Sequence, residues 1–72
     1  MTQNTDQARD LARITAEYRE MPGMKLTAAQ ASRFWHLGVE ETRVLLESLV
    51  DAGVLWRTAD RYYVLVAGSS LV

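Results

Sequence analysis

A chain of 72 residues allows one small domain, which buries only about 60% of the surface that its unfolded state exposes. The absence of cysteine excludes a disulfide framework and a thiolate metal site, and a hydrophobic content of 49% excludes a disordered chain. The net charge of −1 is unusual for a dedicated DNA-binding domain, because phosphate contacts normally require a basic excess.

The ends of the chain carry no recognisable targeting or membrane segment. Residues 1–6 are polar and lack the basic and apolar regions of a signal peptide. No apolar run approaches the ~18 residues of a membrane helix. We therefore expect a cytoplasmic protein without membrane contact, with a disordered segment at 1–4, a domain at 5–66 and a flexible tail at 67–72.

A first helix of about five turns is predicted before Pro22-Gly23, since proline disfavours a helical residue before it. Asn4 or Thr5 can cap this helix. Apolar residues at spacings of three, four and three predict one buried stripe, made of Leu11, Ile14, Tyr18 and Met21. Residues 24–26 follow and are predicted to be extended.

A capping box predicts where the second helix begins. The Thr27 side chain can accept a hydrogen bond from the backbone N–H three residues on, and the Gln30 side chain can reach back to the cap. We expect a helix over 28–35, with Ala31 and Phe34 facing the core.

A third helix is expected over 39–52, after a tight break at His36-Leu37-Gly38. Its apolar periodicity predicts a buried stripe of Thr42, Leu45, Leu46, Leu49 and Val50. Gly53 then stands in the C′ position at which many helices end.

The C-terminal part predicts a β-hairpin with strands at 54–58 and 61–66 and a turn at Ala59-Asp60. Side chains alternate between the two faces of a strand. Leu55, Tyr63 and Leu65 should therefore face the core, and the opposite face should carry Trp56, Tyr62 and Val64, beside Val54.

The order helix, helix, helix, strand, strand resembles the winged helix-turn-helix superfamily. The stretches 26–31 (LTAAQA) and 45–55 (LLESLVDAGVL) carry this resemblance. They are similar to the DNA-binding domains of IclR-type and MarR-type bacterial repressors and to short, stand-alone winged-helix proteins of bacteria. The resemblance implies an α+β fold of three helices followed by a two-stranded wing.

In this superfamily the third helix enters the major groove and the wing reaches flanking phosphates or the minor groove. The resemblance therefore implies three groups of contact residues. On the third helix these are Val39, Glu40, Arg43 and Glu47, on the wing Arg57 and Arg61, and around the second helix Thr27, Gln30, Arg33 and His36.

Several of these residues have a second interpretation. Glu40 and Glu41 repel phosphates, and they can either stabilise the helix dipole or accept a hydrogen bond from cytosine. His36 is either a plain turn residue or a phosphate contact. Arg57 and Arg61 either bind phosphates or keep the hairpin tip soluble.

The apolar face of the hairpin suggests a protein interface. Trp56, Tyr62 and Val64 form either a cross-strand cluster or an exposed patch for self-association or a partner. Trp35 and Val44 either add to this patch or form a second one. The residues offer no nucleophile–base pair, glycine-rich phosphate loop or metal-ligand cluster, so we expect neither an enzyme nor a cofactor. Two hypotheses remain: a homodimeric DNA-binding transcriptional regulator, and a protein-interaction or dimerisation module.

Overall fold

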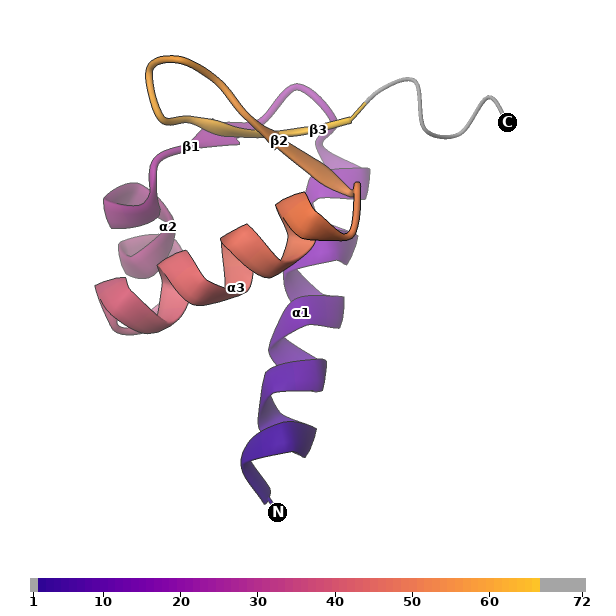
Figure 1. Cartoon of the computed structure of the whole chain (residues 1–72), viewed down its shortest axis with the longest axis vertical. Coiled ribbons are helices and arrows are strands. Elements are labelled where there is room, and N and C mark those ends of the chain that lie inside the picture. The colour runs from indigo at the N-terminus through magenta and orange to yellow at the C-terminus, as the bar shows by residue number, and fades with distance from the viewer. Residues whose placement is uncertain (1, 67–72) are drawn as a thin grey trace.

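The computed structural model describes residues 2–66, with side chains from residue 7 onward. It is an α+β fold of three helices and three short strands (Figure 1). In chain order these are α1 (Thr2–Glu20), β1 (Lys25–Leu26), α2 (Ala28–Trp35), α3 (Val39–Asp51), β2 (Leu55–Arg57) and β3 (Tyr63–Leu65). None of the described helices combines the length and the apolar character needed to cross a bilayer.

The first helix begins at Thr2, ahead of the caps predicted at Asn4 or Thr5. The polar residues before these positions include no proline or glycine that would end the helix. The N-terminal half of α1 extends beyond the rest of the molecule (Figure 1). The tail predicted at 67–72 lies outside the described residues.

The sheet has three antiparallel strands in the order β1-β3-β2, whereas the sequence predicted a two-stranded hairpin. The additional strand is β1, which pairs Lys25 with Val64 and Leu26 with Tyr63. The extended conformation of residues 24–26 was predicted, but two extended residues give no periodicity from which a distant partner could be deduced, so the pairing with β3 was missed. Its pairing places β3 at the centre of the sheet, with both of its edges hydrogen-bonded.

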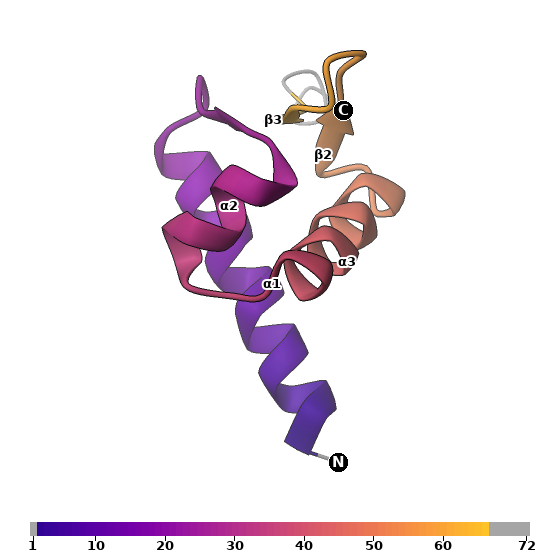
Figure 2. The same ribbon diagram turned by 90° about the vertical axis from the view of Figure 1, so that its left-hand side faces the viewer.

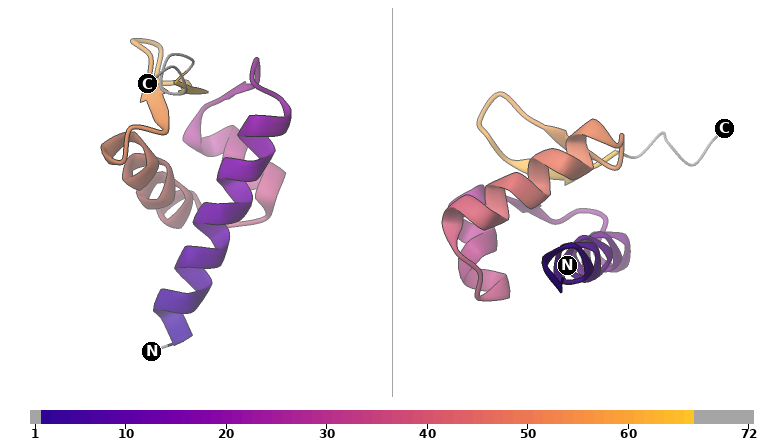
Figure 3. Two further views of the ribbon diagram at one scale, coloured as in Figure 1. Left: turned by 90° about the vertical axis from the view of Figure 1, so that its right-hand side faces the viewer. Right: turned by 60° about the horizontal axis from the view of Figure 1, so that its bottom comes forward.

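The core lies where the three helices and the inner face of the sheet meet. α3 runs between α1 and the hairpin, and α2 packs against α3 and β1 (Figures 2 and 3). The buried apolar side chains come from all three helices and from β2 and β3. They are Ile14, Tyr18, Ala31, Trp35, Leu45, Leu46, Leu49, Leu55 and Tyr63.

Two predictions about the core were wrong. Phe34 is 48% exposed, and the next residue, Trp35, is buried instead. The rings of these two residues meet edge to face with centroids 5.3 Å apart. A helix of two turns is too short for apolar spacing to define which side faces inward, because one residue turns the side chain by about 100°. Met21 is also exposed, since it lies just beyond the end of α1.

The predicted caps of α2 are confirmed. The Gln30 backbone N–H donates to Thr27 Oγ1 at 3.2 Å, and the Thr27 backbone N–H donates to Gln30 Oε1 at 3.0 Å. The helix ends at His36, which has the left-handed backbone conformation with φ of 58°. The Leu37 N–H then donates to the Ser32 carbonyl, which satisfies a carbonyl in the last turn.

The C-terminal end of α3 is closed by a Schellman motif around Gly53. The Val54 N–H donates to the Leu49 carbonyl and the Gly53 N–H to the Val50 carbonyl. Gly53 has φ of +82°, a conformation that a Cβ atom disfavours. No atom lies within 4 Å of the position of a Cβ at this residue. The cost of an alanine there would therefore come from the backbone alone.

Gly53→Ala should lower the free energy of unfolding by about 1 kcal/mol, because the left-handed backbone conformation is unfavourable for alanine. No steric clash adds to this cost. Urea denaturation followed by circular dichroism measures this loss. Gly23→Ala is the matched control, since Gly23 has equal space around it and no positive φ. If Gly53→Ala and Gly23→Ala were equally stable, the positive φ of Gly53 would not be the cause of the lost stability.

Candidate nucleic-acid interface

An open groove runs between α3, the start of α2 and the β2–β3 hairpin. Its helical wall comes from the outward side of α3, and its other wall is the turn of the hairpin. Thirteen residues line it: Thr27, Ala28, Arg43, Val44, Glu47, Ser48, Asp51, Arg57, Thr58, Ala59, Asp60, Arg61 and Tyr63. The groove therefore joins the three regions from which the sequence predicted DNA contacts.

The structure brings together five of the ten predicted contact residues. The residues in the groove are Thr27, Arg43, Glu47, Arg57 and Arg61. The other five lie outside its lining: Gln30, Arg33, His36, Val39 and Glu40. Gln30 is engaged in the capping box, and Arg33 and His36 lie at the far, C-terminal end of α2.

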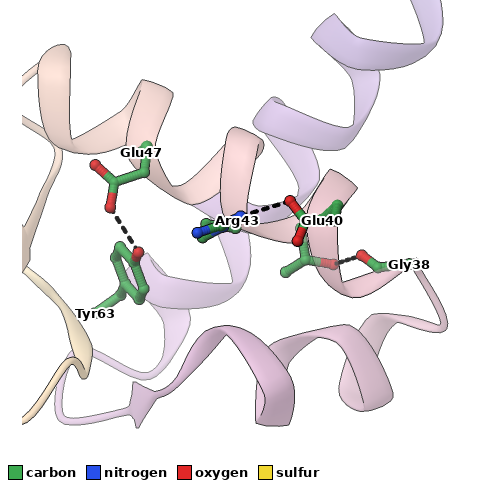
Figure 4. Close-up of polar contacts among 6 residues, drawn as sticks. Gly38, Glu40, Arg43, Glu47 and Tyr63 are labelled. Carbon is green, nitrogen blue, oxygen red and sulfur yellow. Dashed lines mark hydrogen bonds and ion pairs between the residues drawn. The ribbon is translucent and has the colours of Figure 1, made fainter.

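Side-chain charges in the groove cancel, because three arginines face three carboxylates. Two of the arginines are also paired. Arg43 forms an ion pair with Glu40 at 2.5 Å, and Arg57 forms one with Glu47 (Figure 4 shows the first). These contacts raise the pKa of both guanidinium groups. Of the arginines in the described part of the groove, Arg61 alone has no ion pair.

Glu47 is the centre of a small network that links α3 to the sheet. The hydroxyl of Tyr63 donates to Glu47 Oε2 at 2.7 Å (Figure 4). Arg57 contacts the same oxygen. The pKa of Glu47 is lowered mainly by the Tyr63 hydrogen bond, against an opposing effect of burial, and further by Arg57. The pKa of Tyr63 is raised by burial and by Glu47. Glu47 is thus held as a carboxylate between two donors.

The hairpin turn differs from the prediction of a two-residue turn at Ala59-Asp60. The Arg61 N–H donates to the Thr58 carbonyl, and the Thr58 N–H donates to the Tyr62 carbonyl, so three residues form the loop. Arg61 closes the loop with φ of 70°. A three-residue hairpin normally places glycine at this left-handed position. Because Arg61 stands where a glycine would be expected, nothing in the local sequence predicts the three-residue loop.

Eight of the thirteen groove residues are not among the predicted contacts, and the contact of the Tyr63 hydroxyl with Glu47 was missed as well. Val44, Ser48 and Asp51 lie on the outward side of α3 and Asp60 lies in the turn. The helical period that placed Glu47 outward could have found Val44 and Asp51, which are three and four residues away. The hydroxyl contact of Tyr63 could not be found this way, because alternation assigns its ring to the core.

The three candidates for a protein interface share the outer face of the sheet, as predicted, but Val54, which was predicted beside them, packs against the core. Trp56 pairs with Val64 across the two strands and is 58% exposed. Tyr62 and Val64 are half-buried, and the ammonium of Lys25 lies 4.9 Å from the centre of the Tyr62 ring. Neither Trp35 nor Val44 adds to this patch. Trp35 is in the core, and Val44, although exposed, lines the groove.

Trp35 carries the one buried side-chain donor in the described part of the chain that lacks a partner, its Nε1. No group of acidic or histidine side chains among residues 7–66 is arranged to hold a metal ion. Comparison with protein family models, with curated proteins and with solved structures gave no match.

Glu47→Gln should lower the urea midpoint at pH 7 by about 0.5 M, a small effect because the Glu47 side chain is 35% exposed and solvent screens its pairs. The folded pKa of Glu47 is lowered, so its stabilisation is full above the unfolded pKa of about 4.3. The stabilisation is lost as the pH falls through the folded pKa. The two proteins should therefore unfold alike in strongly acidic buffer.

Glu20→Gln is the control for this measurement, because Glu20 is exposed and has no ion pair within the described residues. A midpoint difference between wild type and Glu47→Gln that stays constant from neutral to acidic pH would contradict the role given to the ionised carboxylate.

Proposed function

We propose that this chain is a DNA-binding transcriptional regulator of the winged helix-turn-helix type, which binds duplex DNA in the groove between α3 and the hairpin. The observation that carries the proposal is the convergence of Thr27, Arg43, Glu47, Arg57 and Arg61 on one groove from three separate elements. In winged-helix DNA binders the same three regions contact the duplex together. The three-helix, three-strand architecture is compatible with this assignment.

The charges of the groove limit how strongly one copy can bind. Each phosphate contact contributes a slope of about −0.9 to the dependence of log affinity on log salt. Three arginines therefore set a limit of about −2.7 for one copy. A homodimer would double this limit and read two half-sites.

Arg61 gives independent support for a functional groove. Its left-handed backbone costs roughly 1–2 kcal/mol, which glycine would avoid. Its side chain forms no ion pair within the described residues, so no salt bridge there offsets the strain. Strained residues of this kind cluster at functional sites, where the side chain is needed for binding.

Arg61→Gly should therefore raise the free energy of unfolding by about 1 kcal/mol and weaken duplex binding at the same time. The magnitude of the salt slope should fall by about 0.9, the value for one lost phosphate contact. Fluorescence anisotropy with a random-sequence duplex over a salt series measures the slope, and urea denaturation measures stability.

Arg61→Lys is the matched control, since it keeps both the charge and the backbone strain. It should leave the slope and the stability near the wild-type values. If Arg61→Gly is stabilised but binds DNA with an unchanged slope, Arg61 does not contact phosphate. If the wild-type protein shows no salt-dependent binding, the proposed function is wrong.

The second candidate function is a protein-interaction module in which the outer face of the sheet binds a second copy of the chain. The exposure of Trp56 beside Val64 favours it, because large exposed apolar side chains on a small domain mark interaction surfaces. β2 is also an edge strand, so its outer edge is open to backbone pairing.

Trp56→Thr should convert a dimer into a monomer, because it removes the largest exposed side chain of this face while keeping β propensity. Light scattering at micromolar concentration measures the mass in solution. Val44→Thr is the control, since Val44 is similarly exposed but lies in the groove. A monomeric wild type, or equal masses for wild type and Trp56→Thr, would contradict self-association through this face.

A further inference from the structure

We propose that Glu47 acts as an internal substitute for a DNA phosphate, which holds Arg57 in the free protein and so restrains binding of the duplex. This inference rests on the proposed function, because it concerns the same groove. It differs from that function in assigning an inhibitory role to a residue that the resemblance places among the DNA contacts.

The first support is the position of the pair. Arg57 lies on β2 and Glu47 lies on α3, ten residues apart in the chain, and both line the groove. Their ion pair therefore crosses from one wall of the groove to the other. A carboxylate oxygen accepts a hydrogen bond from a guanidinium as a phosphate oxygen does, so Glu47 Oε2 occupies Arg57 at a place that a DNA phosphate could take.

The second support is that the Glu47 side chain is less exposed than that of Arg57, at 35% against 51%, and accepts a hydrogen bond from a core residue. Tyr63 is 4% exposed and lies in the central strand of the sheet, so its hydroxyl has little freedom. That hydroxyl donates to the same Glu47 oxygen that Arg57 contacts. The Arg57 side chain is 51% exposed. Arg57 can thus turn to a ligand while Tyr63 keeps Glu47 in position.

The other ion pair of this surface lacks such an anchor. Glu40 and Arg43 are three residues apart on α3, and their side chains are 81% and 55% exposed. A pair of this kind is weak and open to competition from solvent and salt. Glu47, which Tyr63 anchors, is therefore the carboxylate that we expect to limit duplex binding. The exposed Glu40 lacks such an anchor and should have a smaller effect.

Release of Arg57 has two consequences that add together. The freed guanidinium gains a phosphate contact, and the loss of the carboxylate removes a like charge from beside the phosphate. Glu47→Gln should therefore raise duplex affinity about tenfold at low salt and steepen the salt slope by about 0.9, the value for one added contact.

The experiment measures binding of a random-sequence duplex by anisotropy from about 50 mM to about 200 mM salt. It compares wild type, Glu47→Gln, Arg57→Gln and the double variant. When Arg57 is already replaced by glutamine, adding Glu47→Gln should no longer steepen the salt dependence of binding, because Glu47 then has no Arg57 to release. Glu41→Gln is the charge-matched control, since Glu41 is exposed on α3 and forms no ion pair within the described residues.

Tyr63→Phe provides a test that leaves the net charge unchanged. It removes the hydroxyl that anchors Glu47, so it should raise affinity in the same direction as Glu47→Gln but by less. Urea denaturation of each variant establishes that it is folded before binding is compared.

The possible outcomes separate the two proposals. If wild type binds and Arg61→Gly weakens binding, but Glu47→Gln gains nothing, the inhibitory role of Glu47 is wrong and the proposed function stands. If Glu41→Gln gains as much as Glu47→Gln, the effect is one of net charge and the inhibitory role is again wrong. If no variant binds duplex in a salt-dependent way, the proposed function itself fails.

Discussion

The arrangement of this small domain depends on one buried hydrogen bond, from the hydroxyl of Tyr18 to the carbonyl of Tyr63 at 2.8 Å. It joins α1 to the central strand β3 across 45 residues of sequence. Tyr18 is fully buried, and this burial raises the pKa of its hydroxyl well above its usual range. The hydroxyl therefore remains a neutral donor, and leaving it without a partner in the core would be costly.

Strand β3 also connects this buried hydrogen bond to the candidate site. The backbone of Tyr63 accepts the bond from α1, and its side chain donates to Glu47 on α3. A small domain has few buried contacts with which to fix the geometry of a surface groove. Here one tyrosine connects α1, the sheet and α3, so the position of Glu47 follows directly from the packing of the core.

Sequence reasoning succeeded where the determining interaction is local. The start of α2 follows from the capping box at Thr27, and the end of α3 follows from Gly53 in the C′ position. It failed where the determining interaction is distant. The pairing of β1 with β3 and the contact between Glu47 and Arg57 leave no spacing pattern in the chain, because each joins residues ten or more positions apart.

The two candidate surfaces need not exclude each other, because they use alternate residues of one strand. Arg57 faces α3 and the groove, and its neighbour Trp56 points to the outer face of the sheet beside Val64. A second copy bound at the outer face would therefore leave the groove open. It would also double the number of arginines presented to a duplex, which matters for a chain whose single groove has no excess of positive charge. Self-association through Trp56 would in this way double the possible phosphate contacts, while each groove keeps its three arginines and three carboxylates.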